Sequence, residues 1–356
     1  MKFLDTERVH DMSFYKSLGL SYPLIQAPML GIQGSAMAIA CSEAGALGSL
    51  PCAMLNAEKL EEELVTIKGA TSKPVNVNFF VHEDPAPNAS RDVKWRETLA
   101  PYFNEVGLNS AEVKAGPGRA PFSSDMADVL EKFKPEVVSF HFGLPSSELL
   151  QRVRSWGARI LSSATTVEEA VFLADQSVDA VIAQGLEAGG HRGHFLSDDI
   201  TKQLGVFSLL PQIKQAIDLP VIAAGGIASP KEVKAMLELG ADMVQVGTSY
   251  MLCDEANTIS LHREALKSSD AQHTALTNLF SGRPARGIVN RLMRELGPMS
   301  ELPPEFPLAG GLIGPLKAAA EKQGIHDFSS LWAGQNTTGC KEVSAVDMTK
   351  WLVSEI

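Results

Sequence analysis

A glycine-rich segment that contains a histidine has the residue types needed for proton transfer beside a bound ligand. Residues 179–195 read DAVIAQGLEAGGHRGHF, so an apolar run of strand length ends in a loop that places His191 between Gly190 and Gly193. Glycine lets backbone N–H groups approach a ligand closely. Histidine titrates near neutral pH. The segment therefore predicts His191 as a catalytic side chain.

Two further glycine turns, residues 224–227 and 245–248, follow the next two apolar runs. Backbone N–H groups in such turns, together with the dipole of the helix that follows, can hold a phosphate without lysine. A tight strand-to-helix turn explains any one of these loops but accounts poorly for all three. Together they indicate a phosphorylated ligand, and no lysine stands at a strand end to suggest Schiff-base chemistry.

Polar side chains also stand at the ends of predicted strands. Gln26, Asn78 and Gln184 are placed to pair with the edge of an isoalloxazine ring, so FMN fits this set. Asn78 faces either a polar ligand or the wet side of an edge strand, and we favour the ligand because a doubly covered sheet disfavours an unpaired amide. His141 ends another strand, where it either points at the catalytic rim or packs against backbone.

Eight predicted strands alternate with helices and position these loops. They cover residues 22–27, 46–50, 74–81, 136–141, 159–162, 179–183, 219–224 and 242–246. The order predicts an α/β fold of the TIM type, a (β/α)8 barrel. The alternative is an open doubly wound sheet, but PMLGIQG after the first strand lacks the GxGxxG spacing of that fold.

The pattern changes after the eighth strand. We expect residues 1–256 to form the barrel and residues 257–356 to form a smaller, mostly helical cap that returns to it. The long connection 84–119 is expected to form a lid or a wall of the site.

Bulk composition excludes several classes of protein. The formal net charge of −11 argues against nucleic acid as a partner. The sequence contains no run of about 18 apolar residues, so we expect no membrane span. Its start, MKFLDTERVHDMSF, lacks the pattern of a secretory signal. Cys41, Cys52, Cys253 and Cys340 match no metal-site or disulfide spacing. We expect a cytoplasmic protein with reduced cysteines and no metal.

Six motifs together resemble the nitronate monooxygenase family: QAPMLGIQG, VNFF, AQGLEAGGHRGHF, IAAGGI, VQVGTSYM and LWAGQ. The resemblance extends from about residue 22 to 335. It implies non-covalently bound FMN and oxidation of alkyl nitronates, of the propionate 3-nitronate type, by molecular oxygen. The products would be a carbonyl compound and nitrite or related nitrogen oxides, which suits detoxification. The partners would be the nitronate and oxygen, and a homo-oligomer stays open.

The resemblance also implies roles for single residues. His191 would be catalytic, either as a cation that holds the nitronate or as a neutral base that deprotonates a nitroalkane, and His141 would bind substrate. Phe306 stands where the family has a tyrosine near the substrate. The implied FMN contacts are Ala27, Pro28, Met29, Asn78, Gln184, Gly189, Gly190, Gly226, Gln245, Val246, Gly247, Thr248, Trp332, Gly334 and Gln335.

Two other functions stay open at this point. An NADH-dependent flavin enoyl-[acyl-carrier-protein] reductase shares a loop like EAGGH, although an acidic chain suits an acyl carrier poorly. A non-catalytic FMN-binding protein belongs to another class, and two histidines at the rim argue against it. A purine-nucleotide dehydrogenase barrel is disfavoured, because no cysteine follows GGI at the distance of a nucleophile.

Overall fold

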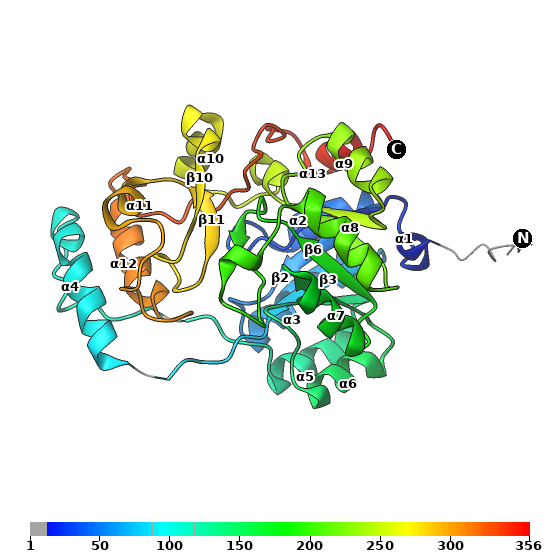
Figure 1. Cartoon of the computed structure of the whole chain (residues 1–356), viewed down its shortest axis with the longest axis horizontal. Coiled ribbons are helices and arrows are strands. Elements are labelled where there is room, and N and C mark those ends of the chain that lie inside the picture. Colours follow the sequence, from blue (N-terminus) through cyan, green and yellow to red (C-terminus); the bar gives the residue numbers. More distant parts are fainter. Residues whose placement is uncertain (1–12, 87, 117) are drawn as a thin grey trace, which may run out of the picture.

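Eight parallel strands form the centre of the computed structural model, which describes residues 13–86, 88–116 and 118–356 (Figure 1). Their order around the sheet is β1-β9-β8-β6-β5-β4-β3-β2. The two ends of this order meet, because the Leu47 N–H donates to the Leu24 carbonyl and the Gln26 N–H donates to the Leu47 carbonyl, both at 2.9 Å. The predicted (β/α)8 barrel is confirmed.

The eight strands overlap the eight predicted ranges. They are β1 (Leu24–Gln26), β2 (Gly48–Pro51), β3 (Val75–Phe80), β4 (Val137–His141), β5 (Arg159–Ala164), β6 (Ala180–Gln184), β8 (Val221–Ala224) and β9 (Met243–Val246). The helices around them are α1 (Phe14–Ser17), α2 (Ser35–Glu43), α3 (Ala57–Ala70), α5 (Ser124–Phe133), α6 (Ser147–Ser155), α7 (Val167–Asp175), α8 (Val206–Ala216), α9 (Pro230–Glu238) and α13 (Ala345–Leu352). Short 3₁₀ turns are η1 (Ile200–Lys202), η2 (Thr248–Leu252) and η3 (Ser269–Gln272).

Local chemistry explains where these helices begin. The Asn56 side chain accepts a hydrogen bond from the Lys59 N–H at 2.9 Å and caps α3. Ser229 caps α9, and Pro230 occupies its first turn, where a missing N–H costs nothing. Inside the barrel, Ile25, Leu47 and other apolar residues pack against the segment that contains α1, which closes the end opposite the loops discussed below.

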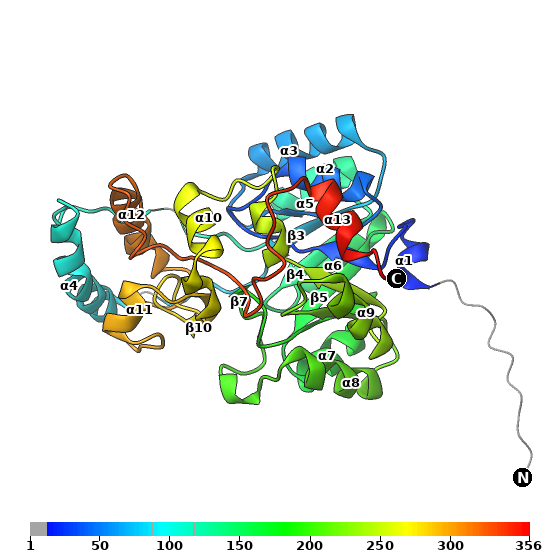
Figure 2. The same ribbon diagram turned by 90° about the horizontal axis from the view of Figure 1, so that it is seen from above.

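A second group of elements lies beside the barrel mouth (Figures 1 and 2). It comprises α4 (Ala89–Glu105), α10 (Ser260–Lys267), α11 (Arg291–Leu296), α12 (Gly310–Glu321), β10 (Thr274–Thr277) and β11 (Ala285–Ile288). Helix α4 comes from the long connection 84–119, and its Trp95 and Leu99 share an apolar cluster with Leu312 and Leu316 of α12. This connection therefore forms the outer layer of the predicted cap.

The cap also contains a small antiparallel sheet, in the order β10-β11-β7. Strand β7 (Gly190–His191) belongs to the loop after β6, so this sheet joins the cap to the barrel. The division at residue 256 stays a prediction, and two segments cross it in space: α4 packs in the cap, whereas α13 packs against α2 and α9 of the barrel.

Within the described ranges, every helix is too short or too polar to span a lipid bilayer. Residues 1–12, on which the expectation of no secretory signal depends, lie outside the described residues.

Candidate active site at the barrel mouth

His191 is held by its backbone in β7, where it lies opposite Ala285 of β11. Its carbonyl accepts hydrogen bonds from Gln184 Nε2 at 3.0 Å and from His141 Nε2 at 3.1 Å. The Gln184 Oε1 accepts from the Gly193 N–H at 2.8 Å, so both ends of this amide bind the loop. Strands β4 and β6 thus fix the position of the His191 backbone at the mouth.

The His191 ring lies in an aromatic enclosure. The rings of Phe306, Trp332, Phe80 and Phe142 have centroids 5.4, 5.6, 5.9 and 6.1 Å from it. Its Nε2 lies 2.9 Å from Ser281 Oγ in the cap. Burial is the main cause that lowers the pKa of His191 well below its ordinary value, so the ring is neutral at physiological pH.

Neighbouring groups lower the pKa of His191 further. They are Arg119 from the long connection, His141, Arg283 from the cap, and His82. Arg119 and Arg283 form no ion pair with any carboxylate in the described part of the chain, and the Nε of each is buried without a partner. The sequence reasoning missed both arginines. Their only signal is an arginine within glycine- and proline-rich turns, GPGRAP and SGRP.

His141 has no free ring nitrogen. Its Nε2 donates to the His191 carbonyl, and its Nδ1 lies 3.0 Å from Ser163 Oγ. Burial lowers the pKa of His141 to about 3, so this ring is also neutral. Contact between His141 and a substrate stays a prediction, and the hydrogen bonds present here position His191 instead.

Two other predicted strand-end groups have protein partners. Gln26 and Gln33 form a buried amide pair, in which Gln33 Nε2 donates to Gln26 Oε1 at 3.0 Å. Asn78 Nδ2 donates to Ser139 Oγ at 2.9 Å, on a β3 strand that is buried along its whole length and is not an edge strand. The Oε1 of Gln245, in contrast, is buried without a partner. A bound ligand with a hydrogen-bond donor would satisfy it.

The glycine loops meet the tail segment at the mouth. A Cβ on Gly189 would lie 2.6 Å from Gly334 N, and one on Gly334 would lie 2.9 Å from the Glu187 carbonyl. The Gly334 N–H donates to Thr248 Oγ1 at 3.0 Å, so the tail is joined to the loop after β9. Only glycine fits at these contacts, because the backbones of the loop and the tail segment pack directly against each other.

The remaining predicted cofactor residues fall into two places. Met29 and Ala27 lie beside Gly247, where a Cβ would be 3.6 Å from the sulfur and 3.4 Å from the Ala27 Cβ. The Ala27 N–H donates to the Val246 carbonyl at 2.8 Å. Trp332 lies instead against the His191 ring. The structure thus brings the ends of β1 and β9, the loop after β6 and the tail segment to one mouth, and the contacts of these residues with a cofactor stay a prediction.

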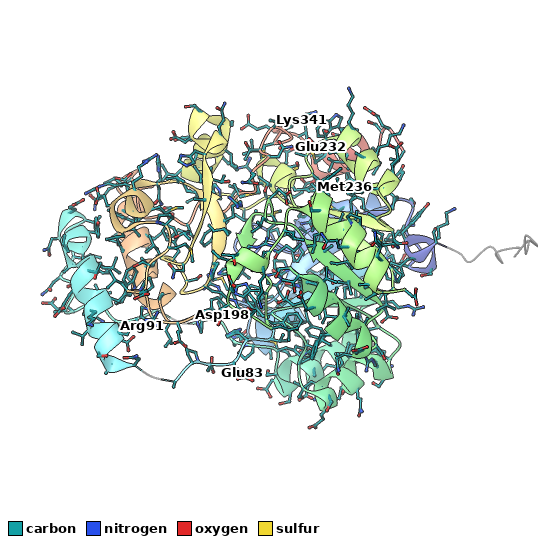
Figure 3. The ribbon with its side chains drawn as sticks, viewed as in Figure 1. Glu83, Arg91, Asp198, Glu232, Met236 and Lys341 are labelled. Carbon is teal, nitrogen blue, oxygen red and sulfur yellow. The ribbon has the colours of Figure 1, made fainter. Side chains whose placement is uncertain are left out.

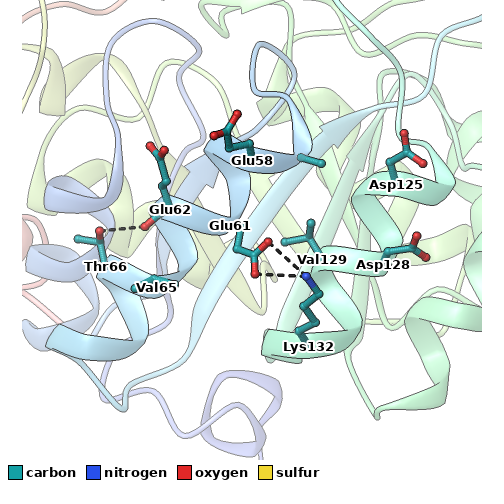
Figure 4. A pocket seen from close by; sticks show the side chains of 10 residues that line it. Glu58, Glu61, Glu62, Val65, Thr66, Asp125, Asp128, Val129 and Lys132 are labelled. Atoms are coloured by element: carbon teal, nitrogen blue, oxygen red, sulfur yellow. Dashed lines mark hydrogen bonds and ion pairs between the residues drawn. The ribbon is translucent and has the colours of Figure 1, made fainter.

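The surface has one hollow beside this site and another far from it. One, of about 440 Å³, adjoins it and is lined in part by His82, Phe142, Asp198 and Arg283. Asp198 and Glu83 of this hollow are labelled in Figure 3, near the gap between barrel and cap. The other lies between α3 and α5 on the outside of the barrel, where Glu61 binds Lys132 (Figure 4). Its lining includes no residue of the mouth, so it takes no part in the site.

No group of three or more histidine, cysteine, aspartate or glutamate side chains is arranged to hold a metal ion in the residues that the structure describes.

Comparisons with known proteins agree with this geometry. The family model "Nitronate monooxygenase" matches residues 13–355. A nitronate monooxygenase of Pseudomonas aeruginosa is 39% identical over 346 residues, which cover 96% of this chain and 98% of that protein. A probable nitronate monooxygenase of Bacillus subtilis is 35% identical over 345 residues, covering 96% and 98%.

Solved structures extend the comparison to three dimensions. A nitroalkane oxidase from Streptomyces ansochromogenes superposes with a TM-score of 0.88 at 36% identity, covering 96% of this chain and 97% of that one. FabK from Thermotoga maritima, at 22% identity and a TM-score of 0.72, covers 96% and 94% and shares the fold. The chain belongs to the nitronate monooxygenase family, whose members are flavin-dependent oxidoreductases that oxidise nitronates.

Proposed function

We propose that this enzyme uses FMN and acts on alkyl nitronates that carry a second anionic group, such as propionate 3-nitronate. Oxygen is the co-substrate, and the products are a carbonyl compound with nitrite or related nitrogen oxides. The observation that carries this proposal is a neutral His191 beside two half-buried arginines, Arg119 and Arg283, that have no carboxylate partner in the described residues. Buried cations without counter-ions are costly, and an anionic ligand removes that cost.

The mouth fits a flavin mononucleotide. Bound there, FMN would supply the electron transfer between the nitronate and oxygen. We assign the phosphate to the glycine turns after β6, β8 and β9, where backbone N–H groups and the start of the following helix can hold a dianion. The unpartnered Gln245 Oε1 suits a donor on the ring system. The predicted contacts of Ala27, Pro28, Met29 and Thr248 belong to the same mouth.

The protein's own side chains divide the remaining work. Arg119 and Arg283 would attract and orient the anionic substrate through charge-assisted hydrogen bonds. Since His191 is neutral, we assign it the role of base that takes a proton from a nitroalkane carbon, and the cationic role is disfavoured. The aromatic enclosure of Phe80, Phe142 and Phe306 excludes water from this step. His141 acts as a positioning residue through the His191 carbonyl.

Oxygen uptake on purified yellow protein tests the proposal. Propionate 3-nitronate is expected to start rapid oxygen consumption with release of nitrite, and mass spectrometry of the acid-released chromophore is expected to identify FMN. A colourless protein that cannot be reconstituted contradicts the cofactor assignment. A yellow protein that consumes no oxygen with any nitronate contradicts the substrate assignment.

Because the chain shares its fold with FabK, the alternative function to test is that of an NADH-dependent flavin enoyl reductase. Anaerobic mixing separates the two functions, because rapid bleaching of the bound flavin by NADH favours the reductase and rapid bleaching by nitronate favours our proposal. A flavin that neither reagent bleaches would indicate a non-catalytic FMN-binding protein. Cytoplasmic location, a role in detoxification and a homo-oligomeric state remain predictions.

A further inference from the structure

Ser281 is a fully buried residue of the cap that contacts the ring of His191. It lies in the connection between β10 and β11, and its Oγ is 2.9 Å from His191 Nε2. The turn that holds it is tightly packed, because a Cβ on Gly282 would lie only 2.2 Å from the Pro304 carbonyl. Gly282 also has a φ of 88° and donates from its N–H to the Asn278 carbonyl at 2.8 Å. The hydroxyl is therefore presented from a rigid support.

The second partner of the Ser281 hydroxyl determines the direction of these hydrogen bonds. Its Oγ also lies 3.2 Å from the Arg283 carbonyl, which can only accept. A serine hydroxyl has one proton, so when it donates to this carbonyl its lone pairs are left to accept. The His191 Nε2 must then carry a proton that it donates to Ser281, and Nδ1 carries the lone pair.

The neighbouring histidines follow the same logic. His141 Nε2 faces the His191 carbonyl and must donate, so Ser163 donates to its Nδ1. His82 Nε2 lies 3.1 Å from the Arg119 carbonyl and must also donate. Each ring therefore has its proton on Nε2. For His141 and His82 this follows because Nε2 faces a backbone carbonyl, which can only accept. In the described residues, His82 Nδ1 is buried without a partner, and the ring of His191 forms its hydrogen bond through Nε2, which leaves its Nδ1 available.

We propose that Ser281 is a positioning residue that holds neutral His191 in the Nε2–H tautomer, so that Nδ1 is the basic atom. In the proton-transfer step, the Nδ1 lone pair takes the proton from the nitroalkane carbon. The electron pair of that C–H bond stays on the substrate as the nitronate, and His191 becomes a cation that later returns the proton to solvent. This inference rests on the proposed role of His191 as base.

The tautomer can be observed directly by NMR. Long-range ¹H–¹⁵N correlation spectra of the full-length flavoprotein with labelled histidine distinguish a protonated ring nitrogen from one with a lone pair. His191→Gln identifies the signals of residue 191. We expect Nε2 protonated and Nδ1 unprotonated at pH 7.5, with Ser281→Ala shifting the signals toward a mixture of tautomers. A wild-type spectrum with the proton on Nδ1 overturns the inference.

Kinetics supply a second readout. Ser281→Ala is expected to lower the rate with a nitroalkane roughly tenfold or more while changing the rate with the preformed nitronate much less, because only the first needs a base. Ser281→Thr keeps the hydroxyl and is expected to restore the ratio of the two rates. Equal losses on both substrates overturn the inference.

A matched control separates this effect from simple destabilisation. Ser42 is another buried serine, whose hydroxyl donates to the Pro74 carbonyl at 2.8 Å and accepts from the Gly48 N–H at 3.1 Å, outside the mouth. Ser42→Ala removes a similar pair of hydrogen bonds and is expected to leave the rate ratio unchanged. The proposed function fails separately: a correct tautomer without oxygen uptake on any nitronate contradicts the function and leaves the tautomer assignment intact.

Discussion

The arginines on the outside of the barrel differ from those at its mouth. Arg152 on the outer surface binds Asp128 at 2.6 Å and Glu131 at 2.7 Å, and these carboxylates raise its pKa. Arg119 and Arg283 at the mouth are half-buried, and removal from solvent lowers the pKa of each. Neither binds a carboxylate in the part of the chain that the structure describes. The outer ion pair suits solubility, whereas the inner cations need an anion from outside the chain.

A third buried arginine shows that burial alone does not produce an anion site. Arg192 donates to the carbonyls of Gln184 and Gly185 at 2.7 Å and to Gln203 Oε1 at 2.8 Å. Each of its nitrogens has a protein partner, so it stabilises the loop and requires no ligand. Arg119 and Arg283 differ from Arg192 because each has a buried Nε without a partner, and they form no ion pair with a carboxylate in the described residues.

The largest expected effect comes from removing the base that the inner cations surround. His191→Ala is expected to lower kcat/KM for a nitroalkane by roughly 10²–10⁴-fold, the usual contribution of general base catalysis. The nitronate should lose less, because it needs no deprotonation. Oxygen-uptake kinetics on both substrates measure the split, and an equal loss on both would show that His191 serves binding alone.

Removing an inner arginine tests whether it binds the second anionic group. Arg283→Met is expected to lower kcat/KM for propionate 3-nitronate about 10- to 100-fold, because a charge-assisted hydrogen bond contributes about 1.5–3 kcal/mol. Arg119→Met should act in the same direction. The control substrate is an alkyl nitronate of similar length that lacks the carboxylate, and its kcat/KM should fall much less. If kcat/KM falls equally for both nitronates, the difference between inner and outer arginines is unrelated to the second charge of the substrate.

The pH dependence reports the field of the inner cations on His191. The pKa of His191 is lowered by burial and by the neighbouring Arg119, His141, Arg283 and His82. The ring therefore becomes protonated only at a pH below 6.5, the ordinary pKa of histidine. The acid limb of kcat/KM for a nitroalkane is therefore expected to have its midpoint below 6.5. Arg283→Met removes a positive charge and should move that midpoint upward. A midpoint that is above 6.5 in the wild type, or that moves downward in the variant, contradicts this assignment.

The smallest effect is expected at the outer ion pair. Arg152→Met removes contacts with Asp128 and Glu131 that are exposed to solvent, and exposed pairs contribute little to stability. We expect unchanged kinetics on every nitronate and a urea midpoint within experimental scatter. A loss of activity comparable to that of Arg283→Met would remove the contrast between the two regions.

Residues near one another in the chain were predicted well. The alternation of apolar runs with helix signals predicted all eight barrel strands, and Asn56 and Ser229 predicted two helix starts that the structure confirms. The prediction of the polar strand faces was weaker. Gln26 pairs with Gln33, from the segment between β1 and α2, and Asn78 pairs with Ser139 on the next strand. Periodicity shows which face a residue is on, but not which partner meets it there.

The sequence by itself determined the barrel, the glycine loops and the histidine among them, since each depends on contacts or spacings within one βα unit. Only the tertiary structure decided the surroundings of that histidine. Ser281 is 90 residues from His191 along the chain, and the arginines come from the long connection and the cap. No local rule relates such segments, because the free energy that brings them together comes from packing the cap on the mouth. That packing buries His191 and makes the ring neutral.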